Sequence, residues 1–417
     1  MNAYIESYGC SLNKADSEAI KGHLSENGFD FTAIEKAKLI IINACAVKEQ
    51  TENRMLRRIR ELFAVSKKSN AQLIVFGCLS EINPKAISEI SPEIIYLPPS
   101  LAELSKFLKI EEKEFSPEIK QEKFNPFISI IPISRGCISN CSYCCVRSAR
   151  GKLKSYSLEE IKKKFRECIK ETKEIWITAQ DTGAYGLDRK TNLAFLLKEL
   201  LKEKGNFRIR VGMINPQHLK NLYPQLIPLY KDERMYKFFH VPIQSGSNRI
   251  LKLMNRNYSA ELCRKLFKKL KKDFPSAAIS TDIIVGFPSE KEAEFNQTLK
   301  LLEFISPDIV NISRFGARPN TEAKKMKGQL HGRIKKKRSR IASILCRKIA
   351  FEKNKSLEGK ILTAFVSEKG EKGGFIGRTS SYKPVLLNKK GIMGKFVKIK
   401  IVKAFPTYSK GKILKIL

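Results

Sequence analysis

The chain has 417 residues, enough for two or three domains that each bury a core. Its 79 Lys and Arg against 42 Asp and Glu give a net charge of +37, which favours a polyanionic partner. No stretch approaches the roughly 20 apolar residues that cross a bilayer, and the N-terminus resembles no signal peptide. We therefore expect a cytoplasmic protein without a membrane partner, whose ten cysteines are more typical of metal ligands than of disulfides.

Residues 1–110 alternate short apolar runs with helical patterns, which predicts a doubly wound α/β domain. The expected strands are 3–8, 39–44, 73–76 and 94–97, and the expected helices are 15–27, 51–66 and 84–90. A cysteine follows each of the first three strands: Cys10, Cys45 and Cys78. Because parallel strands end at one edge of a sheet, these cysteines could meet there; three separate core cysteines are the alternative.

A second group of cysteines follows the charged segment 111–126, which reads as an interdomain linker. Cys137, Cys141 and Cys144 form a C-x3-C-x2-C run. Three thiolates at this spacing can wrap one face of a four-iron cluster and leave one iron open to a small molecule. Zinc is the alternative, but no matching cysteine pair or histidine follows nearby.

Six further strands alternate with helices and predict a partial or open parallel barrel, which has its active site at the strand ends. The expected strands are 127–131, 174–178, 208–214, 238–243, 279–285 and 309–315. The expected helices are 157–173, 193–204, 217–229, 259–272 and 291–304, the first opened by a capping box at Ser157.

Several of these strands end in polar groups suited to holding a cofactor. Gln180 and Asp181 follow one strand, and Gln244 and Ser245 follow another. Each block alone is typical of a turn, but their recurrence favours an active-site rim that includes these four side chains.

The C-terminal region is the most basic part of the chain. A helix is expected at 332–354, with either a solvated or a phosphate-binding basic face. Apolar runs at 362–366, 375–378, 385–387, 396–402 and 413–416 predict a small five-stranded β-barrel. Its Lys and Arg side chains would hold phosphates, and Phe375 or Tyr382 would stack on a base unless they are buried.

The cysteine run 137–144, with Tyr143 as the aromatic residue before its last cysteine, resembles the signature of radical S-adenosylmethionine (radical SAM) enzymes. The resemblance implies that the open iron binds S-adenosylmethionine beside Tyr143, and that the reduced cluster cleaves it to a radical. The motifs around Cys10, Cys45 and Cys78 resemble the N-terminal domain of methylthiotransferases, where they hold an auxiliary four-iron cluster that carries sulfur. The C-terminal region is similar to the TRAM RNA-binding domain.

The resemblance implies two four-iron clusters, S-adenosylmethionine as cosubstrate, and domains at 1–110, 127–355 and 356–417. The block 181–186 resembles the archaeal and eukaryotic branch, which acts on N6-threonylcarbamoyladenosine next to the anticodon of tRNA. In that chemistry one S-adenosylmethionine methylates the sulfur and a second gives the radical that removes hydrogen from C2. An electron donor and the tRNA anticodon stem-loop are the implied partners.

Other readings remain beside this one. The same chemistry could act on isopentenyladenosine in tRNA or on a ribosomal-protein aspartate, and a noncatalytic iron-sulfur RNA-binding protein is a different class. Two positions depart from the family pattern: Asn320 stands where relatives usually have Gly, and Cys145 is either a spare ligand or a structural thiol. His240 either contacts a ligand or is structural, whereas Cys168, Cys263 and Cys346 are expected to be ordinary core or surface residues.

Overall fold

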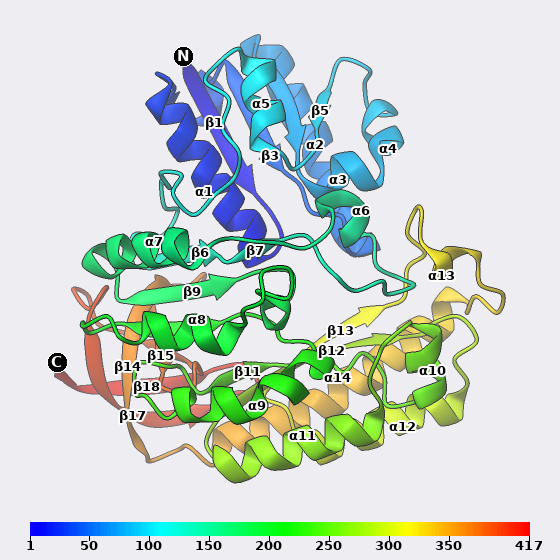
Figure 1. Ribbon diagram of the computed structural model, residues 1–417, viewed down its shortest axis with the longest axis vertical. Coiled ribbons are helices and arrows are strands. Elements are labelled where there is room, and N and C mark those ends of the chain that lie inside the picture. The colour runs from blue at the N-terminus through cyan, green and yellow to red at the C-terminus, as the bar shows by residue number, and fades with distance from the viewer.

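The N-terminal unit is a parallel sheet of five strands covered by helices on both faces (Figure 1). The computed structural model describes residues 1–417. The strand order is β2-β1-β3-β4-β5, and the central strand β3 is buried along its whole length. Its alternating side chains feed two apolar cores, one containing Ile40 and Ile42 and the other Leu39 and Ile41. This arrangement confirms the doubly wound prediction.

The strands are β1 (Asn2–Ser7), β2 (Asp30–Phe31), β3 (Leu39–Asn43), β4 (Gln72–Phe76) and β5 (Ile95–Leu97). The helices are α1 (Ser11–Glu26), α2 (Glu49–Ser69), α3 (Cys78–Ile82), α4 (Pro84–Ser88), α5 (Leu101–Leu108) and the 3-10 turn η1 (Ile34–Lys36). The sequence patterns gave no sign of β2, α3 or α5.

Residues 111–126 have no helix or strand but pack along the N-terminal unit. Phe115 and Ile119 are buried in one of its two apolar cores. The backbone N–H of Glu122 donates to the carbonyl of Glu18 in α1 at 2.9 Å. Residues 111–126 are therefore a strap that is packed against the N-terminal unit, and not a free linker. The charged residues around Phe115 and Ile119 gave no sign in the sequence that these two side chains are buried.

The central unit holds six parallel strands that form two adjoining sheets, β6-β9-β10 and β11-β12-β13. A parallel bridge from Ile209 to Met235 joins the two sheets. Helices cover the outer face, where the largest apolar core lies. The partial barrel is as predicted, and α7 begins at a complete capping box between Ser157 and Glu160.

The six strands are β6 (Ile128–Pro132), β9 (Glu174–Thr178), β10 (Arg208–Val211), β11 (Phe238–His240), β12 (Ala278–Val285) and β13 (Ile309–Arg314), and a short ribbon pairs β7 (Ser134–Arg135) with β8 (Lys154–Ser155). The helices are α6 (Val146–Arg150), α7 (Leu158–Glu171), η2 (Thr182–Ala184), α8 (Leu193–Leu200), α9 (Pro216–Tyr230), α10 (Asn248–Leu253), α11 (Ala260–Asp273), α12 (Glu292–Ile305), α13 (Glu322–Lys325) and α14 (Gly332–Lys355).

The C-terminal unit is a closed five-stranded barrel in the order β14-β15-β16-β18-β17, as predicted. Its strands are β14 (Ile361–Lys369), β15 (Phe375–Thr379), β16 (Pro384–Leu387), β17 (Phe396–Ala404) and β18 (Ser409–Ile416). In Figure 1 it lies against the central unit, on the side away from the N-terminal sheet. None of the helices is both long and apolar enough to cross a membrane.

Of the two alternatives for Tyr382, base stacking or burial, the structure shows burial. This side chain is buried where the barrel meets the central unit, with ring centroids 4.9 Å from Tyr236 and 5.2 Å from Phe238. The Arg210 guanidinium lies 5.1 Å from the Tyr382 ring. Phe375 packs against the apolar core of the barrel, so both aromatic residues hold the fold together.

Candidate active site

Three cysteines meet at the carboxyl edge of the N-terminal sheet. Cys10 is the residue before α1, Cys45 follows β3, and Cys78 is the first residue of α3. Gly9 has a φ of +125°, and a Cβ there would lie 2.7 Å from the Cβ of Cys45. Only glycine therefore lets the Cys10 loop approach Cys45 so closely.

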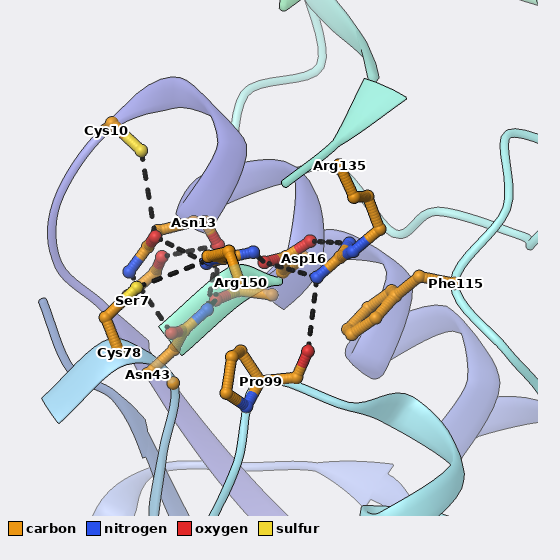
Figure 2. Close-up of polar contacts among 12 residues, drawn as sticks. Ser7, Cys10, Asn13, Asp16, Asn43, Cys78, Pro99, Phe115, Arg135 and Arg150 are labelled. Carbon is orange, nitrogen blue, oxygen red and sulfur yellow. Dashed lines mark hydrogen bonds and ion pairs between the residues drawn. The ribbon is translucent and has the colours of Figure 1, made fainter. Parts of the chain in front are cut away.

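Buried polar side chains fix the loops that carry these cysteines (Figure 2). The Asn43 amide donates to the carbonyl of Asn13 and to the Ser17 hydroxyl, both at 2.9 Å. The Asn13 amide donates to the carbonyl of Tyr8 at 3.0 Å. Because each group is satisfied inside the fold, the network locks the ends of β1 and β3 onto α1.

Two arginines of the central unit enter this network at Asp16 (Figure 2). Arg135 lies 2.6 Å and Arg150 2.5 Å from separate oxygens of the Asp16 carboxylate. Arg150 also donates from Nε to the sulfur of Cys78 at 3.3 Å. A residue of the neighbouring unit thus donates a hydrogen bond to a sulfur of the first cysteine group.

The second cysteine group lies in the loop between β7 and α6. The backbone N–H of Ser139 donates to the Cys137 sulfur at 3.4 Å, and Arg256 donates to the Cys141 sulfur at 3.0 Å. Ser142 anchors the loop by donating from its hydroxyl to the carbonyl of Leu253 at 2.7 Å. The two cysteine groups share one feature, which is a single arginine that donates to one sulfur.

The charge state of the thiols bears on what they can hold. Burial raises the pKa of Cys45 to about 12 and that of Cys144 to about 12, so the bare thiols are neutral. Positive charge from Arg150 acts in the opposite direction on Cys45. Metal ligation requires thiolates, and both arginines would stabilise them.

No group of three or more His, Cys, Asp or Glu side chains is spaced to hold a single metal ion. A four-iron cluster instead binds each thiolate through a separate iron, so its ligands lie further apart. The donor set, three sulfurs and one arginine that donates to a sulfur in each group, fits such a cluster. The assignment of the six cysteines as cluster ligands stays a prediction.

The rim residues Gln180, Asp181, Gln244 and Ser245 fall into different settings. Asp181 is buried and accepts hydrogen bonds from the backbone of Gly183 and from the ring of His218, at 3.0 and 2.9 Å. Ser245 is also buried and lies against Thr298 of α12, at 3.4 Å between their hydroxyl oxygens. Gln180 has a buried side-chain oxygen with no partner, and Gln244 lines a pocket. Gln180 and Gln244 are therefore better placed for a ligand, and the cofactor role of all four stays a prediction.

A pocket of about 230 Å³ lies where the two units meet. Lys48 and Glu49 border it from the N-terminal unit, Tyr143 from the cysteine loop, Gln244 from the loop after β11, and Arg314 from the end of β13. Tyr143 is held edge-on against Phe287, with 6.4 Å between ring centroids. The pocket brings together residues from both units and from the loop of the second cysteine group.

The structure also places the residues that departed from the family pattern. Asn320 has a φ of +58°, the left-handed conformation that Gly prefers and Asn tolerates, so the turn is kept. Cys145 is buried in an N-terminal core that also contains Cys78, and its role as a structural thiol stays a prediction. Cys168, Cys263 and Cys346 are buried in the central core, as expected.

The His240 ring donates from Nε2 to the Asp282 carboxylate at 2.8 Å. Burial acts to raise the pKa of Asp282, but hydrogen bonds from His240 and Asn311 hold it below its usual range. His240 therefore has a structural partner beside the pocket.

Arginine residues at the domain junction were missed by the sequence analysis. Arg150 and Arg256 each donate to a cysteine sulfur, and Arg135 pairs with Asp16. Arg318 forms a buried ion pair with Glu52 of α2. Arg150 is the last residue of α6, the helix that follows the second cysteine group. Its closeness in sequence to those cysteines was the one signal that could have pointed to it.

Comparisons with known proteins agree with this architecture. The Radical SAM superfamily matches residues 131–302, the TRAM domain matches residues 355–414, and an uncharacterized protein family, UPF0004, matches residues 2–97. A probable threonylcarbamoyladenosine tRNA methylthiotransferase of Pyrococcus horikoshii is 40% identical, over 99% of this chain and 100% of the relative. The Xenopus laevis threonylcarbamoyladenosine tRNA methylthiotransferase is 30% identical, over 98% of this chain and 76% of the relative.

A Clostridium botulinum tRNA-2-methylthio-N(6)-dimethylallyladenosine synthase is 33% identical, over 96% of this chain and 94% of the relative. Among solved structures, the radical S-adenosylmethionine methyltransferase TsrM from Kitasatospora setae aligns with a TM-score of 0.54, covering 77% of this chain and 76% of that one. At 11% identity that likeness speaks for the fold alone.

The partial barrel, the three-cysteine loop and the C-terminal barrel together define a radical SAM protein with a TRAM domain. Such proteins use S-adenosylmethionine and a four-iron, four-sulfur cluster. Full-length similarity then identifies the branch: the chain belongs to the threonylcarbamoyladenosine tRNA methylthiotransferase family.

Proposed function

We propose that this chain transfers a methylthio group to C2 of N6-threonylcarbamoyladenosine next to the anticodon of tRNA, giving 2-methylthio-N6-threonylcarbamoyladenosine. It would act in the cytoplasm, with electrons from a separate donor. The observation that carries the proposal is the presence of two cysteine groups at one domain junction, where Arg150, in the helix after the second group, donates to Cys78 of the first. We assign the N-terminal domain to 1–110, the radical SAM core to 127–355 and the TRAM domain to 356–417.

The six cysteines would hold the two clusters, and the pocket beside Tyr143 would admit the reacting molecules. When bound, the clusters and S-adenosylmethionine supply sulfur, a methyl group and a radical able to open an aromatic C–H bond that has no acidic proton. The chain itself orients these groups: the Asn13–Asn43 network fixes one cysteine group, and Ser142 anchors the other.

An arginine without an ion-pair partner at the pocket supports threonylcarbamoyladenosine over dimethylallyladenosine. A threonylcarbamoyl group carries a carboxylate, whereas a dimethylallyl group is apolar and neutral. Lys48 and Arg314 border the pocket without ion-pair partners, beside the carboxylates of Glu49 and Asp282. A guanidinium binds a carboxylate with two hydrogen bonds, and this makes Arg314 the best candidate to recognise the substrate.

Paired lysines on the C-terminal barrel support tRNA as the partner. In the antiparallel ribbon of β17 and β18, Lys398 lies opposite Lys415, Lys400 opposite Lys412, and Lys403 opposite Lys410. Like charges directly opposite one another destabilise a sheet, so a row of such pairs suits a surface that a polyanion neutralises. The stacked rings of Phe405 and Tyr408, with centroids 4.7 Å apart, lie at the end of this lysine ladder.

The test is mass spectrometry of nucleosides in tRNA from a strain that lacks the gene. We expect 2-methylthio-N6-threonylcarbamoyladenosine to disappear, its unmethylthiolated precursor to accumulate, and the wild-type gene to restore the product. An unchanged product peak would overturn the proposal. Loss of a methylthiolated isopentenyladenosine or of a modified ribosomal-protein aspartate would assign one of the rival substrates.

A noncatalytic RNA-binding protein makes a different prediction. It would bind tRNA but would not cleave S-adenosylmethionine after anaerobic reduction of the reconstituted protein. We expect 5′-deoxyadenosine to form, and we expect a Cys141→Ala variant not to form it.

A further inference from the structure

Arg150 makes three contacts with the N-terminal unit, and each uses a different nitrogen (Figure 2). Nε donates to the Cys78 sulfur at 3.3 Å, Nη1 lies 2.5 Å from Asp16, and Nη2 donates to the Asn13 side-chain oxygen at 2.8 Å. The Arg150 side chain is only 1% exposed. Its orientation is thus fully determined, with one edge of the guanidinium group held against a cysteine sulfur.

The charges around Arg150 do not balance within the chain. Asp16 is 1% exposed and is shared with Arg135, whose side chain is 15% exposed. Two guanidinium groups therefore face one buried carboxylate. Buried positive charge is costly unless an anion is close, and the polar atom that Arg150 contacts beyond Asp16 and Asn13 is the Cys78 sulfur.

The helix that carries Arg150 comes directly after the second cysteine group. In this helix, α6, Ala149 packs in the same apolar core as Cys78, and so does Cys145 just before the helix. The segment that follows the radical SAM ligands is therefore seated inside the unit that carries the first cysteine group. The helix α6 therefore joins the loop of the second cysteine group to the core around Cys78.

We propose that Arg150 is the positioning residue of the auxiliary cluster: it compensates the negative charge at Cys78 and raises the reduction potential of that cluster. The inference rests on the proposed function only in assigning a cluster to Cys10, Cys45 and Cys78. Arg256 stands in the corresponding place at the other group, since it donates to the Cys141 sulfur at 3.0 Å. Each cluster would then have one arginine that sets its potential separately.

The sign of the effect follows from charge. Reduction adds an electron to the cluster, and a nearby positive charge and a hydrogen bond to sulfur both favour the reduced state. Replacing Arg150 by Gln removes the charge and should shift the midpoint potential of the auxiliary cluster to more negative values. Asp16 keeps Arg135 as its partner in that variant, so the carboxylate is not left unpaired.

The experiment is a reductive titration followed by electron paramagnetic resonance. It uses the full-length reconstituted protein with Cys137, Cys141 and Cys144 replaced by Ala, so that only the auxiliary cluster gives a signal. We expect Arg150→Gln to lower the midpoint potential and Arg150→Lys, which keeps the charge, to restore most of it. Arg135→Gln is the matched control, because it removes a guanidinium from the same Asp16 without touching a sulfur.

An equal shift in Arg135→Gln and Arg150→Gln, or no shift in Arg150→Gln, would overturn the proposal and leave Arg150 as a structural anchor. If Arg150→Gln does not fold, Arg150→Lys is compared with Arg256→Lys in protein that keeps all six cysteines. In that comparison each must alter the signal of its own cluster only. Failure of the proposed function is separate, because it would appear as unchanged tRNA nucleosides while the shift in potential remained.

Discussion

Arg314 is the residue at which substrate specificity is most open to test. It is exposed at the end of β13, borders the pocket between the two units and has no ion-pair partner. Replacing it by Leu should raise the KM for tRNA that carries threonylcarbamoyladenosine by roughly 10-fold, the effect of losing one charge-assisted hydrogen bond.

The measurement is steady-state methylthiolation with purified tRNA. Arg314→Lys keeps the charge and should retain most of the affinity, whereas cleavage of S-adenosylmethionine without tRNA should be the same in all three proteins. A KM unchanged in Arg314→Leu would remove this residue from substrate recognition.

Glu18 gives a pH dependence of stability that the sequence did not suggest. Burial raises its pKa to about 7, against an ordinary value of 4.5, even though the backbone N–H of Phe124 donates to it. Between these values the folded protein holds a proton that the unfolded chain has lost, so stability falls as pH rises toward about 7.

Glu18→Gln replaces the carboxyl group by an amide that does not ionise, so the loss of stability at higher pH should disappear. The variant should be more stable than the wild type by about 1–3 kcal/mol at pH ~8, and the difference should shrink toward pH ~5. Thermal unfolding of the cluster-free protein at the two pH values measures it. The same difference at both pH values would contradict the assignment.

The residues of the candidate site differ in how well sequence could find them. The cysteines stand out because thiols at fixed spacing are rare, whereas Arg135, Arg150 and Arg256 are three among 79 basic residues. What distinguishes these arginines is contact with a sulfur or with Asp16, and such contacts exist only after folding.

At the scale of single elements, the lysine pairs of β17 and β18 lead to a testable prediction about tRNA binding. Replacing Lys400 and Lys412, which lie opposite one another, by Gln should weaken tRNA binding. It should also reduce the slope of log K against log salt by about 1–2, since each lysine neutralises about one phosphate. Filter binding at several salt concentrations provides the slope.

The matched control replaces two exposed lysines on the N-terminal unit, Lys85 of α4 and Lys106 of α5. Figure 1 places both helices at the opposite end of the molecule. An equal change of slope in both double variants would mean that binding depends on net charge and not on the lysine ladder.

The start of α1 shows why the boundaries of elements were harder to predict than their presence. The apolar pattern predicted a helix from residue 15, but α1 begins at Ser11. Asn13, Asp16, Ser17 and Glu18 are buried in polar networks, so the hidden face of this helix is not apolar. Such a helix loses the periodic signal that reveals an amphipathic one.

For the whole molecule, Tyr382 tests how the C-terminal barrel is fixed to the central unit. Tyr382→Ala should destabilise the protein by about 3–5 kcal/mol, because it leaves a cavity among Trp176, Tyr236 and Phe238. Tyr382→Phe keeps the ring and should cost much less. Thermal unfolding compares the variants, and equal losses would show that ring packing does not hold the barrel in place.

The three units could be predicted from the sequence, but their assembly could not. Strand and helix periodicity is local, whereas the junction depends on pairs such as Arg318 with Glu52 and Arg150 with Asp16, which are far apart in the chain. The strap at 111–126 is another example. Phe115 and Ile119 are buried in one core of the N-terminal unit, and that contact could not be predicted from local sequence patterns.

The most direct test of the account is iron counting after anaerobic reconstitution, with ultraviolet-visible and electron paramagnetic resonance spectra. We expect about eight irons in the wild type, about four in Cys45→Ala, and about eight in the control Cys145→Ala, which removes a buried thiol that the two-cluster assignment does not use. A wild type with only about four irons, undiminished in Cys45→Ala, would contradict the two-cluster junction on which the proposed function depends.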